Sequence, residues 1–159
     1  MRGVSVDRKQ AKVTLDDVPD RSGVAGRVFS AVAGSGISVD MIVQSIGPNQ
    51  TTDLSFTIHE ADMDQTCTIL EPIARELGSG IIAKGGVAKL SVVGIGMRSH
   101  AGVAAKFFEA LGRGGINIEL ISTSEIKIAV VVANKDIDNA ARLTHESFGL
   151  ARLTPIAVS

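Results

Sequence analysis

The chain has 159 residues, nearly balanced charge and few aromatic side chains, and these totals exclude several classes of protein. Sixteen basic and 17 acidic residues give a formal net charge of −1, which indicates neither a nucleic-acid-binding nor an anionic-membrane-binding surface. Trp and Tyr are absent, so base-stacking platforms are not expected. One Cys cannot form a disulfide framework and is typical of a reducing compartment. With neither a membrane-spanning apolar run nor a signal-peptide core in the sequence, we expect a cytoplasmic globular protein.

The segment at 13–36 predicts a strand followed by an amphipathic helix. Apolar residues in VTL alternate with a polar one, as in a strand with one buried face. From about Gly23 the apolar residues recur at three- and four-residue spacing, which predicts a helix. Two further strands are expected at about 38–46 and 52–58, where apolar and polar residues alternate again.

A second helix is predicted after these strands. Asp62 would be its N-cap, and Gln65, three residues later, would complete a capping box. The expected buried stripe of this helix consists of Met63, Cys67, Leu70, Ala74 and Leu77. Pro72 lies inside the helix and predicts a kink or a break, because proline removes a backbone hydrogen bond. A short strand at about 81–83 would follow.

The second half of the chain repeats the pattern of the first. Residues 13–42 align with 89–121, and over the helix the offset is a constant 79 positions, so that Gly23 falls on Gly102. Many apolar and glycine positions match in this way, which indicates an internal duplication. The second copy predicts a strand at about 88–94, a helix at 101–112, strands at 117–123 and 126–133, and a helix at 136–148.

Each copy needs one more strand to form a βαββαβ unit with a four-stranded antiparallel sheet and two helices on one face. The strand at 81–83 serves the first copy, whereas the tail after the second contains Pro155, which disfavours a central strand. The strand VSVD at 4–7 is left over, and we expect it to cross over and complete the second sheet. The sequence therefore predicts an α+β fold of two ferredoxin-like modules. These would comprise residues 11–86 and residues 1–10 with 87–150, followed by a tail at 151–159.

The best candidates for a binding site are the loops before the first helix of each copy, DRSGV (20–24) and SHAGV (99–103). A helix start leaves several N–H groups unpaired and carries partial positive charge, and a glycine lets a carboxylate approach closely. A free amino acid also needs an acceptor for its ammonium group, and Asp20 would supply one. Another interpretation stays open on the residues alone, in which Asp20 or Ser22 simply caps the helix.

No combination of residues indicates catalysis, a metal site or a cofactor. The three His residues have no metal-ligand spacing with one another or with Cys67, and neither HE pair continues into a zincin motif. The loop GIGMRSHAG (94–102) follows a strand and precedes a helix, but it lacks the G-x-G-x-x-G spacing of a dinucleotide-binding loop. We therefore expect a binding protein without catalytic residues, metal or cofactor.

Three stretches of the chain are distinctive: VPDRSGVAGRVFSAVAGSGISVDMIVQS, TTDLSFTI and, most specifically, GINIELISTSEIKI. Together they resemble the C-terminal regulatory region of aspartate kinase, and more narrowly its separate regulatory (beta) subunit. The resemblance covers about residues 4–150. The family's fold is a pair of ACT domains, each βαββαβ. The resemblance implies a regulatory subunit that binds threonine, and in some members lysine, in feedback inhibition of lysine, threonine and methionine synthesis. It also implies a homodimer when isolated, and a catalytic alpha subunit as partner.

The resemblance also assigns effector-binding residues and favours a ligand role for Asp20 over a capping role. The family's threonine contacts correspond to Asp20, Gly23, Val24, Ala25 and Gln44, completed by Asn117 and Ile118, usually from a partner chain. An equivalent second pocket would use Met97, Ser99, Ala101, Gly102, Val103, Ser124 and Glu125. The family commonly has Pro before the Gly at both helix starts, where this chain has Ser22 and Ala101. Which amino acid binds, and whether both pockets are used, stays open.

Two rival functions remain at this point. The first is a free-standing ACT-type amino-acid sensor that acts on another enzyme or on a transcription factor. The second is a small enzyme that holds a nucleotide at the loop 94–102. Co-purification with an aspartate-kinase catalytic subunit separates the first rival from the regulatory subunit, and titration with amino acids and nucleotides separates the second.

Overall fold

The computed structural model describes residues 3–46, 49–93 and 100–149, which form two compact units. The first unit is Lys9–Gly85, and the second combines the described residues up to Arg8 with those from Gly86 onward. The elements are β1 (Gly3–Pro19), α1 (Val24–Gly34), β2 (Val39–Ile46), β3 (Thr51–His59), α2 (Met63–Leu77), β4 (Gly80–Val93), α3 (His100–Arg113), β5 (Ile118–Thr123), β6 (Lys127–Ala133) and α4 (Ile137–Phe148). Short 3₁₀ turns at Glu60–Asp62 and Asn134–Asp136 precede α2 and α4.

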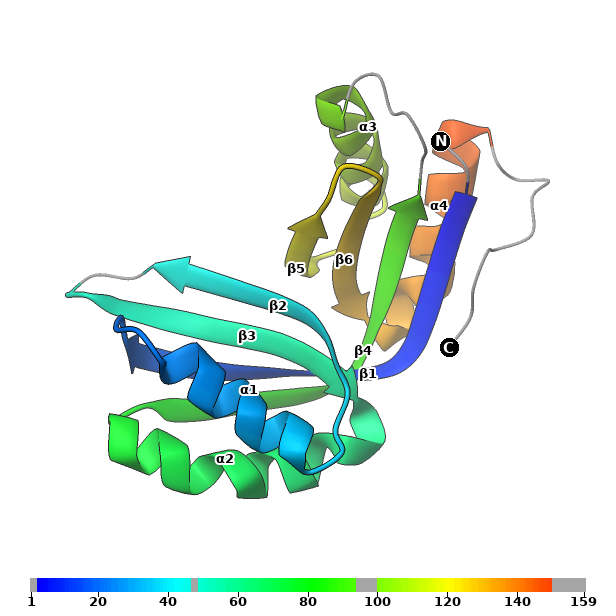
Figure 1. Ribbon diagram of the computed structural model, residues 1–159. Coiled ribbons are helices and arrows are strands. Elements are labelled where there is room, and N and C mark those ends of the chain that lie inside the picture. Colours follow the sequence, from blue (N-terminus) through cyan, green and yellow to red (C-terminus); the bar gives the residue numbers. More distant parts are fainter. Residues whose placement is uncertain (1–2, 47–48, 94–99, 150–159) are drawn as a thin grey trace. The chain divides into compact units, whose positions relative to one another are not determined.

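The first unit is a four-stranded sheet in the order β2-β3-β1-β4, with α1 and α2 covering one face (Figure 1). Strand β3 pairs antiparallel with both β1 and β2, and Val13 lies opposite Phe56. Alternate residues of β1 and β3 therefore point towards the helices and form the core. This core includes Val13, Leu15, Val28, Val32, Leu54, Phe56, Ile58 and Leu70.

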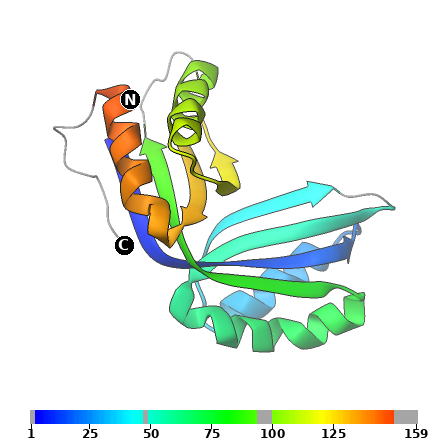
Figure 2. The ribbon, with the colours of Figure 1, turned by 180° about the vertical axis from the view of Figure 1, so that it is seen from behind.

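The second unit has the strand order β1-β4-β6-β5, and Figure 2 shows α3 and α4 on one face of its sheet. Strand β6 pairs antiparallel with β4 and β5, and Leu90 lies opposite Val130. The side chains of the N-terminal strand, Val4 and Val6, belong to this core. Their neighbours in the same cluster include Ala88, Leu90, Val92, Phe107, Leu111, Ile128, Val130 and Ile137.

The predicted α+β class is confirmed, but two pairs of predicted strands are in fact single long strands. Strand β1 has 17 residues and β4 has 14, and each contributes to both units, so the six strands follow one hydrogen-bonded order, β2-β3-β1-β4-β6-β5. Lys9 and Gly86, at the boundaries between the units, have φ of 59° and 67°. Glycine adopts this conformation readily, whereas a side chain such as that of Lys9 costs about 1–2 kcal/mol there. A local pattern could not reveal strands that continue through such positions.

Helix α2 differs from its predicted form at both its start and its middle. The helix runs without a break through Pro72, and Asp62 occupies the N-cap position without a side-chain hydrogen bond, so the predicted capping box is wrong. Thr66 is fully buried and donates from Oγ1 to the Asp62 carbonyl oxygen at 2.7 Å. Cys67 is only half-buried rather than part of the core stripe. Burial, and then the charge of Asp64, raise the pKa of the Cys67 thiol.

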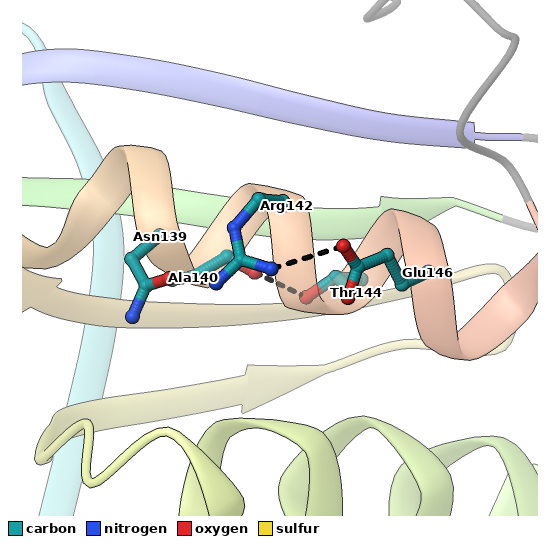
Figure 3. Close-up of polar contacts among 5 residues, drawn as sticks. All are labelled: Asn139, Ala140, Arg142, Thr144 and Glu146. Carbon is teal, nitrogen blue, oxygen red and sulfur yellow. Dashed lines mark hydrogen bonds and ion pairs between the residues drawn. The ribbon is translucent and has the colours of Figure 1, made fainter.

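Helix α4 shows how a polar side chain is accommodated on a buried helix face (Figure 3). Thr144 is fully buried, and its Oγ1 donates to the Ala140 carbonyl oxygen one turn earlier at 2.8 Å. On the exposed side Arg142 pairs with Glu146 at 2.9 Å and donates to the side-chain oxygen of Asn139. The Thr144 hydroxyl therefore finds its acceptor within its own helix, as is common for Thr in helices.

A buried hydroxyl without a partner distinguishes Ser91 of β4. The side chain is fully buried, and its Oγ has no hydrogen-bond partner among the described residues. Since a buried unpaired hydroxyl carries a desolvation cost, Ser91→Ala should raise the free energy of unfolding by about 1 kcal/mol. Urea unfolding measures the change. The contrasting variant is Thr14→Ala, which removes a 2.8 Å hydroxyl contact with Ser55 and should lower stability. Destabilisation by Ser91→Ala would contradict this interpretation.

An ion pair between Arg27 Nη2 and Glu76 Oε2 joins α1 to α2. The hydrogen bond from Arg27, and then its charge, lower the pKa of Glu76. A carboxyl group with a lowered folded-state pKa contributes stability above its unfolded pKa, and this contribution disappears as the pH falls through the folded pKa. We expect Arg27→Gln to move the Glu76 titration to higher pH, as followed by carboxyl ¹³C resonances. Identical titrations in the two proteins would show that the pair does not persist in solution.

Candidate functional site

A cavity of about 310 Å³ in the first unit opens beside the start of α1. It is bounded by the end of β1, the loop at 20–23, the first turn of α1, and residues of β2 and β3. The lining residues are Val18, Pro19, Asp20, Arg21, Ser22, Gly23, Val24, Ala25, Gln44, Thr52 and Leu54. Five residues that the resemblance assigns to the first effector site thus surround one cavity, although they come from two segments 19 residues or more apart.

The start of α1 is not capped by any side chain of the described residues. Gly23 occupies the N-cap position with φ of 89°, a left-handed conformation that favours glycine, and no side-chain hydrogen bond reaches the first turn. Neither Asp20 nor Ser22 therefore acts as a cap, and the capping interpretation is wrong. The first N–H groups of the helix, including those of Val24 and Ala25, are donors without an intrahelical partner beside the cavity.

Main-chain hydrogen bonds position the loop that carries Asp20. The Asp20 N–H donates to the carbonyl oxygen of Gln50 at 2.8 Å, and the Arg21 N–H donates to that of Pro19 at 3.0 Å. The Asp20 carboxylate itself is exposed and makes no hydrogen bond or ion pair with the described residues. It is therefore an available acceptor for a positively charged ligand group at the rim of the cavity.

A β-bulge directs the end of β1 towards this loop. The register against β3 shifts between Leu15 and Val18, and Asp17 inside the shift has φ of 52°. The Asp17 N–H, which the bulge removes from the ladder, donates to Asp53 Oδ1 at 3.1 Å. Bulges of this kind commonly redirect side chains next to binding sites. Val18 and the residues after it consequently reach the cavity.

Gln44 reaches the same cavity from β2. It pairs with Leu54 of β3, so both side chains lie on the helix-covered face of the sheet. Ile42 and Ile46, on either side of Gln44 along the same face, are 52% and 82% exposed. The cavity therefore combines main-chain N–H donors, a carboxylate and an amide with apolar walls, a combination suited to a small zwitterion.

The remaining residues of the first predicted site belong to the second unit. Asn117 is exposed, and Ile118 is half-buried at the start of β5. Neither lines the cavity. The cavity walls that the sequence analysis missed are Val18, Pro19, Thr52 and Leu54. The hairpin register of β2 and β3 could have indicated the last two, because it places them on the same face as Gln44.

The second predicted site is described only in part. Gly102 is exposed and Val103 half-buried in α3. Ser124 and Glu125 are exposed between β5 and β6, where the Ser124 N–H donates to the Lys127 carbonyl oxygen at 2.8 Å. Ala101 lies in the first turn of α3. Met97 and Ser99 lie outside the described residues, as does most of the loop considered for a nucleotide.

Residues 3–46, 49–93 and 100–149 contain neither a metal-binding cluster nor a membrane-spanning helix. In these ranges no group of three or more His, Cys, Asp and Glu side chains is arranged to hold a metal ion. None of the helices there combines the length and the apolar character needed to cross a membrane.

Comparison with known proteins places both units in one family. A family model described as an ACT domain matches residues 16–72 and 90–148. The aspartate kinase of Pseudomonas fluorescens (strain SBW25) is 45% identical over 149 residues, which cover 93% of this chain and 36% of that protein. The aspartokinase of Helicobacter pylori (strain ATCC 700392 / 26695) is 44% identical over 148 residues, with the same coverage. The chain thus spans about a third of these relatives.

Solved structures extend the match to separate regulatory chains. A chain from a crystal structure of aspartokinase alpha and beta subunits is 46% identical, with a TM-score of 0.84, over 93% of this chain and 98% of that one. The ligand-free regulatory subunit of aspartate kinase from Thermus thermophilus is 37% identical, also with a TM-score of 0.84, over 92% and 97%. The resemblance noted in the sequence is confirmed: the chain belongs to the ACT-domain family and is homologous to the regulatory region of aspartate kinases.

Proposed function

We propose that the chain is a regulatory subunit of aspartate kinase and that the cavity of the first unit binds free threonine, with lysine as the second candidate. The observation that supports this most strongly is the uncapped start of α1 beside the unpaired carboxylate of Asp20. An α-amino acid carries a carboxylate and an ammonium group close together. The two charged groups of the ligand match the two unsatisfied groups of the cavity.

Each part of the ligand has a proposed contact. The N–H groups of Val24 and Ala25 bind the carboxylate, because they point out of the positive end of a helix. Asp20 and the side-chain oxygen of Gln44 accept hydrogen bonds from the ammonium group. The side chain of threonine lies towards Thr52 and Leu54, which offer one polar and one apolar contact. The volume of about 310 Å³ lies at the small end of ligand pockets, as expected for an amino acid.

The exposed isoleucines support assembly of two copies around this site. Ile42 on β2 and Ile121 on β5 are related by the 79-residue repeat, and they are 52% and 44% exposed on the edge strands of their units. Large apolar side chains on sheet edges favour association with another chain. In the proposed homodimer, β2 of one copy faces β5 of the other, which brings Asn117 and Ile118 to the cavity.

Regulation follows from a site that two modules complete together. A ligand held between modules favours the arrangement in which both modules contact it. The coupling free energy equals the difference between the ligand's binding free energies in the two arrangements, typically about 1–3 kcal/mol. A catalytic aspartate-kinase subunit would respond to this arrangement in the cytoplasm. We propose that the result is feedback inhibition of aspartate phosphorylation in lysine, threonine and methionine biosynthesis. Co-purification with the catalytic subunit tests the partnership, and a free-standing sensor would not be retained.

Calorimetric titration with threonine, lysine and ATP tests the ligand. Asp20→Ala should weaken amino-acid binding by about 1.5–3 kcal/mol, the range for a hydrogen bond to a charged group. Asp64→Ala removes an exposed carboxylate of α2 that does not line the cavity, and should leave binding unchanged. Equal affinities for the wild type and Asp20→Ala would reject the role of Asp20. Binding of ATP without any amino acid would favour the nucleotide enzyme instead.

A further inference from the structure

In the first unit, the outer edge of β4 has no neighbouring strand among the described residues. Strand β6 pairs with β4 only from Val87 onward, and β1 occupies the other side. The Gly80 N–H donates to Asp16 Oδ1 on β1 at 2.7 Å, so it points inward. Because N–H directions alternate along a strand, those of Ile81, Ala83 and Gly85 point outward. The edge therefore offers a row of main-chain donors and acceptors.

A groove of about 540 Å³ follows this edge between β4 and α2. It is lined by Cys67, Thr68, Glu71, Ala74, Arg75, Ser79, Ile81 and Ala83. On the opposite face of the same strand, Ile82 is 57% exposed. The edge thus combines unpaired main-chain groups with a large exposed apolar side chain, two properties that favour pairing with another strand.

The sequence of the edge, GIIAKG (80–85), is complementary to itself in antiparallel pairing. If Ala83 of one copy lies opposite Ala83 of another, Ile81 faces Gly85, and Ile82 faces Lys84. At the centre of this pairing the small Ala83 residues leave room on the groove side, where the two α2 helices would otherwise crowd. At Gly85 the Glu60 carboxylate occupies the place where a Cβ would stand. On the other face the aliphatic stem of Lys84 can cover the exposed Ile82.

The charges beside the groove are also self-complementary. Glu71 and Arg75 of α2 form an exposed pair at 2.6 Å. A twofold axis makes the two copies of α2 antiparallel, so Glu71 of one copy faces Arg75 of the other. An isologous interface requires this match of a surface with itself. A chain of unrelated sequence would have to reproduce both the strand register and the charge order.

We propose that a second copy of this chain binds at the outer edge of β4 and extends the sheet of the first unit by antiparallel pairing of the two β4 strands. This interface is separate from the β2 and β5 edges and from the amino-acid cavity. A test of this interface is therefore independent of any test of the proposed effector site. In combination with the proposed homodimer it would join dimers into larger assemblies.

Disulfide trapping tests the register directly. With Cys67 replaced by Ser, the chain has no other thiol, so an introduced Cys reports one position. Opposed Ala83 residues would have Cα atoms about 5.5 Å apart, within disulfide range. Ile82→Cys is the matched control, because Ile82 residues would be about 7–8 Å apart diagonally. Under mild oxidation Ala83→Cys should cross-link at least about tenfold faster, and equal or absent cross-linking would overturn the proposal.

Sedimentation velocity of the chain without the introduced cysteines provides the second measurement. Ala83→Pro removes an outward N–H and leaves the pairing with β1 intact, so it should weaken self-association at least about tenfold. Ala83→Ser keeps the N–H and should associate as the wild type does. The comparison is made with Ile42→Asp in every chain, so that association through β2 does not contribute. Identical association of the Pro and Ser variants, or no association at all, would reject the interface.

Discussion

Replacing Gly23 with valine is expected to weaken amino-acid binding about a hundredfold, or about 3 kcal/mol, while the chain stays folded. Gly23 has φ of 89°, and no heavy atom lies within 4 Å of the place where a Cβ would stand. The difficulty is therefore conformational rather than steric, because a β-branched residue strongly disfavours positive φ. The loop must change its path, and the first N–H groups of α1 then lose their direction towards the ligand carboxylate.

A neighbouring glycine of the same helix provides the control. Gly26 lies inside α1 with negative φ, and a Cβ there would also meet no atom within 4 Å. Gly26→Ala should leave binding unchanged and raise the free energy of unfolding by about 0.5–1 kcal/mol, because alanine favours the helix. Calorimetry with threonine and urea unfolding distinguish the two variants. Wild-type affinity in Gly23→Val would show that the loop geometry is not needed for binding.

Truncation of Phe56 should have the largest effect on stability. The side chain is fully buried in the first core, and its ring meets that of Phe29 edge to face, with centroids 5.3 Å apart. Phe56→Ala removes this contact and leaves a cavity, so we expect a loss of about 3–5 kcal/mol in the free energy of unfolding. Thermal and urea unfolding measure this loss.

The equivalent truncation in the second unit shows which core each substitution destabilises. Phe107 is also fully buried, and its ring stacks on that of Phe108 at 5.7 Å. Phe56→Ala should increase amide hydrogen exchange mainly in residues 9–85, and Phe107→Ala mainly in residues 86–149, because each side chain belongs to a different core. Equal loss of protection in both units for either variant would contradict two separate cores.

The sequence predicted the helices and strands well because most have a regular pattern and a clear end. Predicted helices beginning near Gly23 and at 136 and strands at 38–46 and 52–58 agree with α1, α4, β2 and β3 within one or two residues. The internal duplication contributed as much as the periodicity, because each copy supported the interpretation of the other. Burial follows the same patterns, since Val28 and Val32 lie at helical spacing and are fully buried.

The features that the sequence did not predict depend on tertiary context. A lysine with positive φ at the boundary of two units leaves no local signal, so the long strands β1 and β4 appeared as four shorter ones. Pro72 looked like a helix breaker, but packing of Leu70, Ile73 and Ala74 holds α2 together on both sides of it. The 3₁₀ turn before α2 likewise replaced the expected capping box.

The sequence predicted the part of the candidate site that one turn of the chain forms. It predicted less well the parts that depend on strand register or on the assembly of two copies. Asp20 and Gly23 stand out by the chemistry of a helix start, and Gln44 came only from the resemblance. Thr52 and Leu54 were missed because strand register, not composition, brings them to the cavity. The contribution of Asn117 and Ile118 rests on the proposed pairing of two copies.

The most direct test of this account is a ¹⁵N NMR titration of the chain with threonine and with threoninamide, which lacks the carboxylate. We predict that threonine shifts the backbone amide resonances of Val24 and Ala25 more than those of other described residues, and that threoninamide does not. Largest shifts at the groove beside α2, equal responses to both compounds, or no response to any amino acid would contradict recognition at the start of α1.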